Sequence, residues 1–271
     1  MHIFSIFNTR RASADGILKN GIYFDPAIVG KPSVMAAKAS VPTRQRIEVR
    51  FLNQHDLQNL MELERAVWDE TQAASVTEMS VRITRYPTLA IGAFCSETGR
   101  ALASLFARPT SLEAVKRARS WQDCVNHDDS EASRQKALFG ISLSSIDGDA
   151  AKAIFAFFWP HALKNGWQEM YLGSPIPGLR DWIRDNPGQA VENYVFERRK
   201  GLPRDRQLCY YHKKGFQRIV AVRREYFPHA ASMNYGVVIG GRIPLGSLAP
   251  LWKRLPLPWL QAMKQWLFVL Q

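Results

Sequence analysis

Two tyrosines and a histidine in succession, Tyr210, Tyr211 and His212, are the side chains that first suggest chemistry in this sequence. A phenol and an imidazole can each donate or accept a proton. The chain continues with two lysines, Gly215 and Phe216, and then with the apolar run IVAV. This order predicts that the three side chains lie near the end of a helix, directly before a strand.

A second candidate group is the segment LSSIDGDAAKAIF, in which an apolar strand pattern changes to a helical pattern at Gly148. Free N–H groups at a helix N-terminus converge on one point, where the helix dipole adds positive potential. A pyrophosphate fits such a point, because Gly148 lets the backbone approach it and Ala150 leaves the helix start open. A glycine turn before a helix is more often a simple connection, so this segment alone does not establish a phosphate site.

The elements that must position these groups follow from hydrophobic periodicity and turn residues. The predicted order is a strand at 47–52, helices at 57–68 and 77–86, hairpin strands at 88–96 and 100–109, a strand at 136–145, a long helix ending near Gly166, a strand at 168–174, a helix at 205–216 and two closing strands. This order predicts an α/β (mixed α+β) fold, with a twisted, mostly antiparallel mixed sheet of about seven strands and helices on both faces.

The chain also divides by composition. Residues 1–45 lack periodicity and are predicted to form an N-terminal arm, partly without fixed structure. Residues 46–241 form the predicted folded domain, in which 175–206, rich in Pro and Gly, reads as an insertion. Residues 242–271 are an apolar tail, whose stripe from Pro258 onward favours packing on the body over a dimer contact or a membrane surface.

The succession of elements over 46–241 resembles the GCN5-related N-acetyltransferase (GNAT) superfamily. The family marks its strand–helix turn with Gln/Arg-x-x-Gly-x-Gly/Ala, and Ser145–Ala150 falls on this motif, with Gly148 and Ala150 matching. Ser145 replaces the Gln or Arg, and Asp149 adds a negative charge. The family's Tyr-x-x-x-Gly-Phe pattern before the sixth strand fits Tyr211–Phe216 without a gap.

The resemblance implies roles for individual residues. It makes Tyr211 the general acid that protonates the leaving coenzyme A thiolate, a transfer that suits a phenol of pKa about 10 and a thiolate of about 8.5. Glu169 is the candidate general base, and His161 on the preceding helix is a weaker one. His212 is a further catalytic candidate, although its side chain points about 100° away from that of Tyr211. Glu62, Glu64 and Trp68 lie on the first helix, where the family shapes its acceptor pocket, although a tryptophan there is more often part of the core. The resemblance implies acetyl-CoA or another acyl-CoA as the cosubstrate and no metal ion. The residues expected to bind the acyl-CoA are Ser142, Leu143, Ser144, Ser145, Gly148, Asp149 and Ala150.

The insertion further resembles a larger branch of the family, found fused to nitrilase-like hydrolases and in polyketide loading modules. The expected function is acyl transfer from a thioester to an amine or a carrier-protein thiol. Two alternatives stay open: a starter-unit decarboxylase or S-acyltransferase that acts with an acyl-carrier protein, and a degenerate, non-catalytic binding module. The loading-module branch carries a His at the position of Tyr211. This chain's departure from that His favours ordinary acyl transfer over decarboxylation.

The charge and the cysteines limit which partners and which cellular compartment are expected. The net charge is +12, and residues 179–224 supply +7 of it, with 12 Lys/Arg against 5 Asp/Glu. This favours anionic partners such as acyl-CoA and an acidic carrier protein. Nucleic acid is not expected, because no recognisable RNA-binding motif accompanies the charge. Widely spaced cysteines and a short N-terminal apolar stretch predict a cytoplasmic protein. His127, Asp128 and Asp129 read as a solvated loop instead of a metal site.

Overall fold

The computed structural model describes residues 46–68, 70, 72–126 and 135–269, with the side chains from 264 onward left out. The predicted arm at 1–45 and the loop containing His127, Asp128 and Asp129 lie outside the described residues. Among the described residues, no helix is long and apolar enough to cross a membrane.

A mixed sheet organises the described chain, and its seven strands are arranged in the order β1-β2-β3-β4-β5-β9-β8. Neighbouring strands are antiparallel except β4 and β5, which are parallel. The strands are β1 (Ile47–Phe51), β2 (Ala90–Cys95), β3 (Ala101–Thr110), β4 (Ala137–Ser145), β5 (Glu169–Pro175), β8 (Arg218–Arg223) and β9 (Gly236–Arg242). A separate short hairpin pairs β6 (Arg198–Arg199) with β7 (Leu202–Pro203). The predicted fold class is confirmed.

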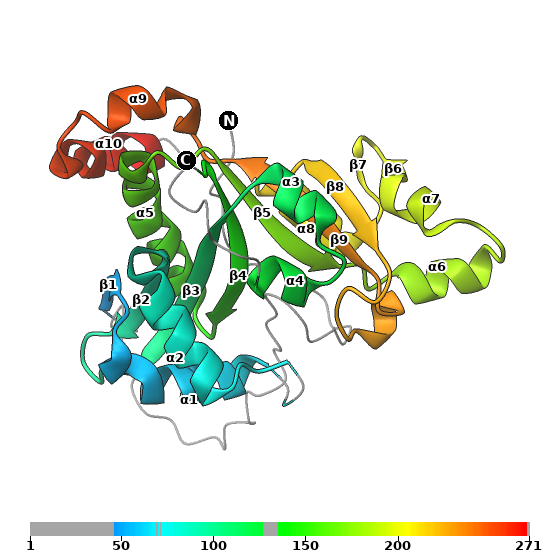
Figure 1. Ribbon diagram of the computed structural model, residues 1–271, viewed down its shortest axis with the longest axis horizontal. Helices are drawn as coiled ribbons and strands as arrows, with labels where there is room; N and C mark the ends of the chain where they lie inside the picture. The colour runs from blue at the N-terminus through cyan, green and yellow to red at the C-terminus, as the bar shows by residue number, and fades with distance from the viewer. Residues whose placement is uncertain (1–45, 69, 71, 127–134, 270–271) are drawn as a thin grey trace, which may run out of the picture.

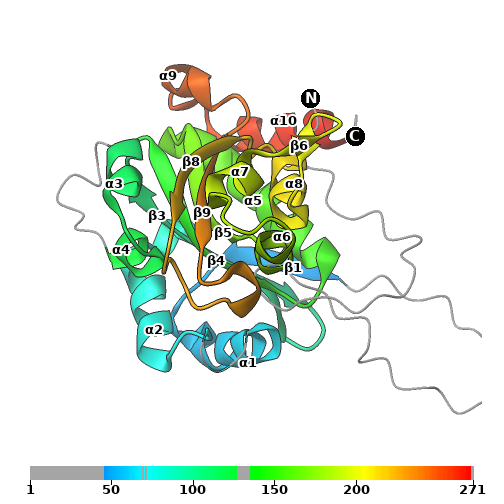
Figure 2. The same ribbon diagram turned by 90° about the vertical axis from the view of Figure 1, so that its right-hand side faces the viewer.

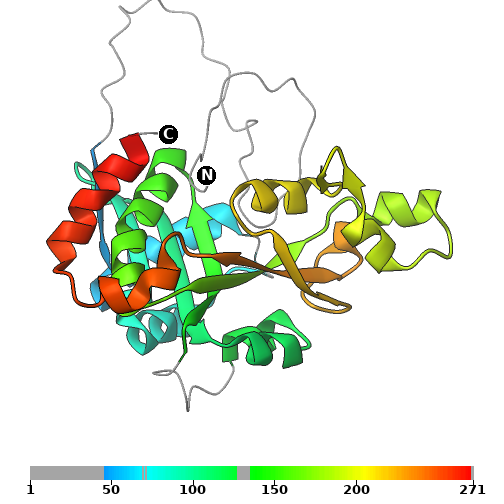
Figure 3. The ribbon, with the colours of Figure 1, turned by 90° about the horizontal axis from the view of Figure 1, so that it is seen from above.

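Helices cover both faces of this sheet (Figures 2 and 3). One face, here the α5 face, carries α5 (Gly148–Asn165), α6 (Leu179–Asp185), α7 (Val191–Phe196), α8 (Arg206–Lys213), α9 (Ala249–Trp252) and α10 (Leu257–Val269). The other, the α1 face, carries α1 (Leu57–Val67), α2 (Val76–Arg85), α3 (Leu112–Arg117) and α4 (Trp121–Asn126). The predicted insertion thus consists of short helices and a small hairpin that precede α8.

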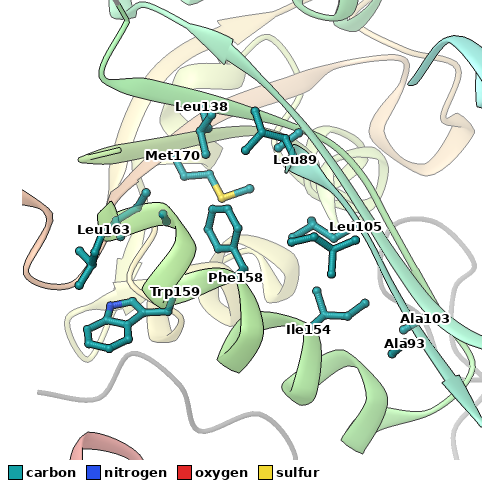
Figure 4. Close-up of a cluster of buried hydrophobic side chains, with 14 of the residues drawn as sticks. Leu89, Ala93, Ala103, Leu105, Leu138, Ile154, Phe158, Trp159, Leu163 and Met170 are labelled. Carbon is teal, nitrogen blue, oxygen red and sulfur yellow. The ribbon is translucent and has the colours of Figure 1, made fainter. Parts of the chain in front are cut away.

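Helix α5 forms the centre of the main core. Figure 4 shows Ile154 and Phe158 of α5 directed toward Leu105 of β3 and Met170 of β5. Their contact follows from the strand alternation, which places every second residue of β3 and β5 on the α5 face. The tail packs on the same core, since Leu260 of α10 is 0 % exposed and belongs to this cluster.

The pairing between β4 and β5 ends halfway along both strands. Their parallel ladder joins residues 137–140 to 169–172. Beyond it, among the residues that the structure describes, β4 pairs only with β3 and β5 only with β9. Figure 1 shows the two strands diverging toward their C-terminal ends. A β-bulge at Ile141, between Gly140 and Ser142, adds one residue to β4 where the strands part. The sheet therefore opens in its middle.

Candidate functional site

A cavity of about 330 Å³ lies where β4 and β5 separate. Gly140–Leu143 of β4 and Met170, Leu172 and Gly173 of β5 form its sides. It reaches both faces of the sheet, because residues from α5 and α8 line it together with residues from α1, α2 and α4. A molecule in this cavity would thus contact both layers of helices.

Tyr211 lines the cavity from the α5 face and is 7 % exposed. Burial raises the pKa of its phenol well above the ordinary value, against a lowering effect of a hydrogen bond to Gln207. The phenol therefore stays protonated at neutral pH and can act as a proton donor. Phe216 and Phe155 line the cavity beside it, and the ring centroids of Tyr211 and Phe216 are 6.1 Å apart in an edge-to-face arrangement.

Asp205 fixes the start of α8, the helix that carries Tyr211. Its carboxylate, in a residue that is 1 % exposed, accepts hydrogen bonds from the N–H groups of Gln207 (2.8 Å) and Leu208 (3.1 Å). It also accepts from the Tyr194 hydroxyl (2.7 Å) and the Gly178 N–H (3.3 Å). One buried carboxylate thus joins α8 to α7 and to the end of β5.

The turn between β4 and α5 closes on its own side chains. The Ser145 hydroxyl donates to the carbonyl oxygen of Asp147 (2.7 Å), and the Asp147 carboxylate caps the helix by accepting from the Ala150 N–H (2.8 Å). Asp149 is exposed and its carboxylate lies 2.9 Å from Lys152 Nζ. The negative charge of Asp149 in this turn is therefore paired with the positive charge of Lys152 on the same helix.

A hydrogen-bonded chain occupies the α1 face of the cavity. Trp68 Nε1 donates to Ser144 Oγ (2.7 Å), and this hydroxyl donates to Glu64 Oε2 (2.7 Å). Glu64 is 2 % exposed, and its other oxygen, Oε1, accepts from the Ala74 N–H (3.1 Å) and lies 4.0 Å from Arg82 Nη1. A buried carboxylate with a cationic neighbour therefore faces the cavity from the side opposite Tyr211.

The structure brings some of the predicted site residues together and separates others. Tyr211, Ser142 and Leu143 line the cavity. Ser144 belongs to the Glu64 chain, while Ser145, Gly148, Asp149 and Ala150 form the turn that leads into α5. The role of each of these residues stays a prediction.

Glu169 and His212 are not among the residues that line the cavity. Glu169 stands where β4 and β5 are still paired, and its carboxylate accepts hydrogen bonds from the Tyr171 hydroxyl and from Arg218 Nη2 (3.0 Å). Burial raises the pKa of Glu169, but these hydrogen bonds outweigh it and hold the pKa below the usual value. His212 is half-buried on α8, and burial together with Arg198 lowers its pKa.

Sequence reasoning missed Arg82, Gln72 and Trp121 as parts of the cavity wall. Helical spacing could have predicted the direction of Arg82. It follows the buried Met79 by three residues and so lies on the buried side of α2. Gln72 is in the connection between α1 and α2, where no periodicity predicts side-chain direction.

Comparisons with known proteins give the fold. No protein-family model and no curated protein sequence matches this chain. Among solved structures, the GphF GNAT-like decarboxylase in complex with isobutyryl-CoA is similar at 24% identity and a TM-score of 0.57, over 72% of this chain and 99% of that one. The loading GNATL domain of CurA from Lyngbya majuscula is similar at 15% identity and a TM-score of 0.60, over 73% of this chain and 98% of that one. The chain thus has the GNAT fold, as the sequence predicts.

Proposed function

We propose that this chain is an acyltransferase that takes an acyl group from acyl-CoA and passes it to an amine or to a carrier-protein thiol. The observation that supports this most is the position of Tyr211. Its protonated phenol lines a cavity that opens between two separated parallel strands.

The residues present suit the thioester arm of an acyl-CoA. Beyond residues 140 and 172, the facing backbone edges of β4 and β5 no longer pair with each other, so amide groups of an extended arm can hydrogen-bond between them. Leu143, Phe155, Leu172 and Phe216 supply apolar contacts for its methylene groups. Acyl-CoA supplies the activated acyl group.

Tyr211 and Glu64 divide the proton transfers in this proposal. Formation of the new bond between acceptor and acyl carbon breaks the carbon–sulfur bond. The phenol of Tyr211 gives its proton to the leaving thiolate, and the carboxylate of Glu64 takes the proton that the acceptor loses. Glu64 replaces Glu169 as the proposed base because Glu64 lines the cavity and Glu169 does not.

Tyr211→Phe tests the proposal directly. The substitution removes only the hydroxyl, so we expect turnover with acetyl-CoA to fall about 100-fold or more, within the usual contribution of a general acid. Calorimetry should show acetyl-CoA binding within about threefold of the wild type. Undiminished turnover would remove the role of Tyr211, and lack of acetyl-CoA binding by the wild type would favour the non-catalytic binding module.

Decarboxylation with a carrier protein is the second candidate, and Arg82 favours it. A guanidinium that lines the cavity could hold the carboxylate of a malonyl group, and one structure of similar fold is called a GNAT-like decarboxylase. Mass spectrometry of a carrier protein incubated with the enzyme and malonyl-CoA decides between the two. A carrier that gains an acetyl group supports this candidate, and an unchanged carrier mass removes it.

A further inference from the structure

We propose that one end of the molecule docks on a membrane surface that carries anionic phospholipids. This inference goes beyond the proposed acyl transfer and does not depend on it. Figures 1 and 2 show α9 and α10 at this end, opposite α1 and α2. The docking region, here called the tail surface, consists of exposed basic and apolar residues in and beside the tail: Lys136, Leu248, Leu251, Lys253, Arg254 and Trp259.

The tail surface contains a pocket of about 620 Å³. Lys136 and Gln168, which directly precede β4 and β5, line it together with Lys253, which follows α9. It therefore lies at the opposite end of these two strands from the cavity that contains Tyr211. Among the described residues, no acidic side chain lines this pocket. Two ammonium groups without a carboxylate beside them give the pocket a positive potential, which suits a phosphate group.

Hydrogen bonds and a buried indole fix the chain around Lys253. Lys164 Nζ, from α5, donates to the carbonyl oxygens of Lys253 (2.8 Å) and Leu255 (2.7 Å). Trp252 is 7 % exposed and packs in the core around α5, and its Nε1 donates to the carbonyl oxygen of Leu245 (2.7 Å). The tail is therefore attached to the body through its inner side, and its outer side is presented to solvent in a defined position.

Exposed apolar side chains gather on this outer side. Of the seven large hydrophobic side chains that are exposed among the described residues, three are in the tail: Leu248 (47 %), Leu251 (51 %) and Trp259 (67 %). Ala249 and Pro250, which lie between the two leucines in the sequence, line the pocket. Apolar side chains thus stand directly beside a cationic pocket, a combination that suits a partner with both anionic and apolar parts.

The charge of the tail favours a lipid surface over other partners. Residues 226–271 contain four Lys/Arg and no Asp or Glu. Two copies of such a surface would repel each other, which disfavours a dimer through it. An anionic bilayer offers phosphate groups to the lysines and an apolar layer to the leucines, and tryptophan is typical of the boundary between the two. A soluble phosphate would satisfy the lysines alone and leave the apolar side chains in water.

Cosedimentation with vesicles tests the docking in the full-length wild-type chain. We expect vesicles of phosphatidylcholine with about 30 % phosphatidylglycerol to bind the chain at least about tenfold more tightly than vesicles of phosphatidylcholine alone, because each lysine near an anionic surface contributes about fivefold. Added salt should weaken this binding, since it screens the lysines. No binding to the anionic vesicles, or equal binding to both kinds, would overturn the inference.

A double variant separates the pocket from the general positive charge of the protein. Lys136→Ala with Lys253→Ala should weaken binding to the anionic vesicles at least about tenfold. Lys116→Ala with Lys200→Ala makes the same change in net charge at exposed positions outside the tail, and its affinity should stay within about twofold of the wild type. An equal loss in both double variants would mean that the overall charge attracts the vesicles, which contradicts a docking surface at the tail.

Leu251→Ser tests the apolar part of the tail surface. It should weaken binding to the anionic vesicles about fivefold, because a half-exposed leucine loses its contact with the apolar layer. Val81→Ser, which changes a similarly exposed side chain on α2 (48 %), is the control and should bind as the wild type does. Unchanged binding by Leu251→Ser would reduce the pocket to a site for soluble phosphate and overturn membrane docking. A wild-type dimer without vesicles that Leu251→Ser dissociates, measured by analytical ultracentrifugation, would assign the surface to a second copy and overturn it as well.

Discussion

At the scale of single residues, the proposed acid is defined by its surroundings more than by its identity. Many tyrosines lie at helix ends, but Tyr211 is buried in the wall of a cavity and has a raised pKa. Burial disfavours the phenolate, so the group stays a proton donor to a higher pH than an exposed tyrosine.

This shift predicts the alkaline side of the pH profile. A general acid must be protonated in the free enzyme, and a raised pKa moves its loss of function to higher pH. We therefore expect kcat/KM to show no decrease from this group up to the ordinary tyrosine pKa of about 10. The profile of the wild type, compared with that of Tyr211→Phe, provides the measurement. A decrease with a pKa near or below 10 that vanishes in Tyr211→Phe would contradict the assignment.

The residue scale also shows where sequence reasoning reaches its limit. The position of Tyr211 near the end of a helix could be predicted, because Gly215, four residues later, marks that end. Glu169 could be placed at the start of a strand, but nothing in the sequence tells where β4 and β5 stop pairing, and this point decides which residues face the cavity. Gln72 lines the cavity from a connection without periodicity, so only the packed structure places it there.

At the scale of elements, the predicted insertion at 175–206 helps to fix the start of α8. The Asp205 carboxylate caps α8 and accepts hydrogen bonds from Tyr194 of α7 and from the N–H of Gly178, the residue directly before α6. Pro and Gly in the sequence predicted short, broken helices here, and the structure has them. The convergence on one carboxylate could not be predicted, because it depends on long-range contacts between segments that show no common periodicity.

Asp205→Ala should therefore destabilise the fold strongly. It removes a helix cap and leaves buried donors, including the Tyr194 hydroxyl, without a partner, at a cost of about 3 kcal/mol in the free energy of unfolding. Urea denaturation followed by circular dichroism measures this change. Asp181→Ala is the control: Asp181 is exposed and pairs with Arg184 on the surface of α6, so its loss should change the stability by about 0.5 kcal/mol or less. Equal midpoints for the two variants would refute the structural role of Asp205.

At the scale of the whole molecule, most of the fold could be predicted from the order of the strands and helices. Alternating strands, a hairpin and long amphipathic helices were enough to predict a mixed sheet covered on both faces, because each pattern must bury one side. The cavity follows from a feature above the element level, the separation of β4 and β5 beyond residues 140 and 172. Its α1 face is completed by Gln72, from the connection between α1 and α2, where sequence patterns are least informative.

The apolar tail gives the last test, since an apolar stripe also suits a dimer or a membrane surface. In the structure α10 packs on α5, with Leu260 0 % exposed and the adjacent Trp259 67 % exposed. Leu260→Ala should lower the free energy of unfolding by about 3 kcal/mol, the usual cost of removing a buried leucine side chain. Trp259→Ala removes a larger side chain from the same turn and should cost far less, because that side chain is mostly in water. Thermal unfolding of both variants measures the difference, and a tail that served mainly as a docking or membrane segment would show the reverse order or no effect from either change.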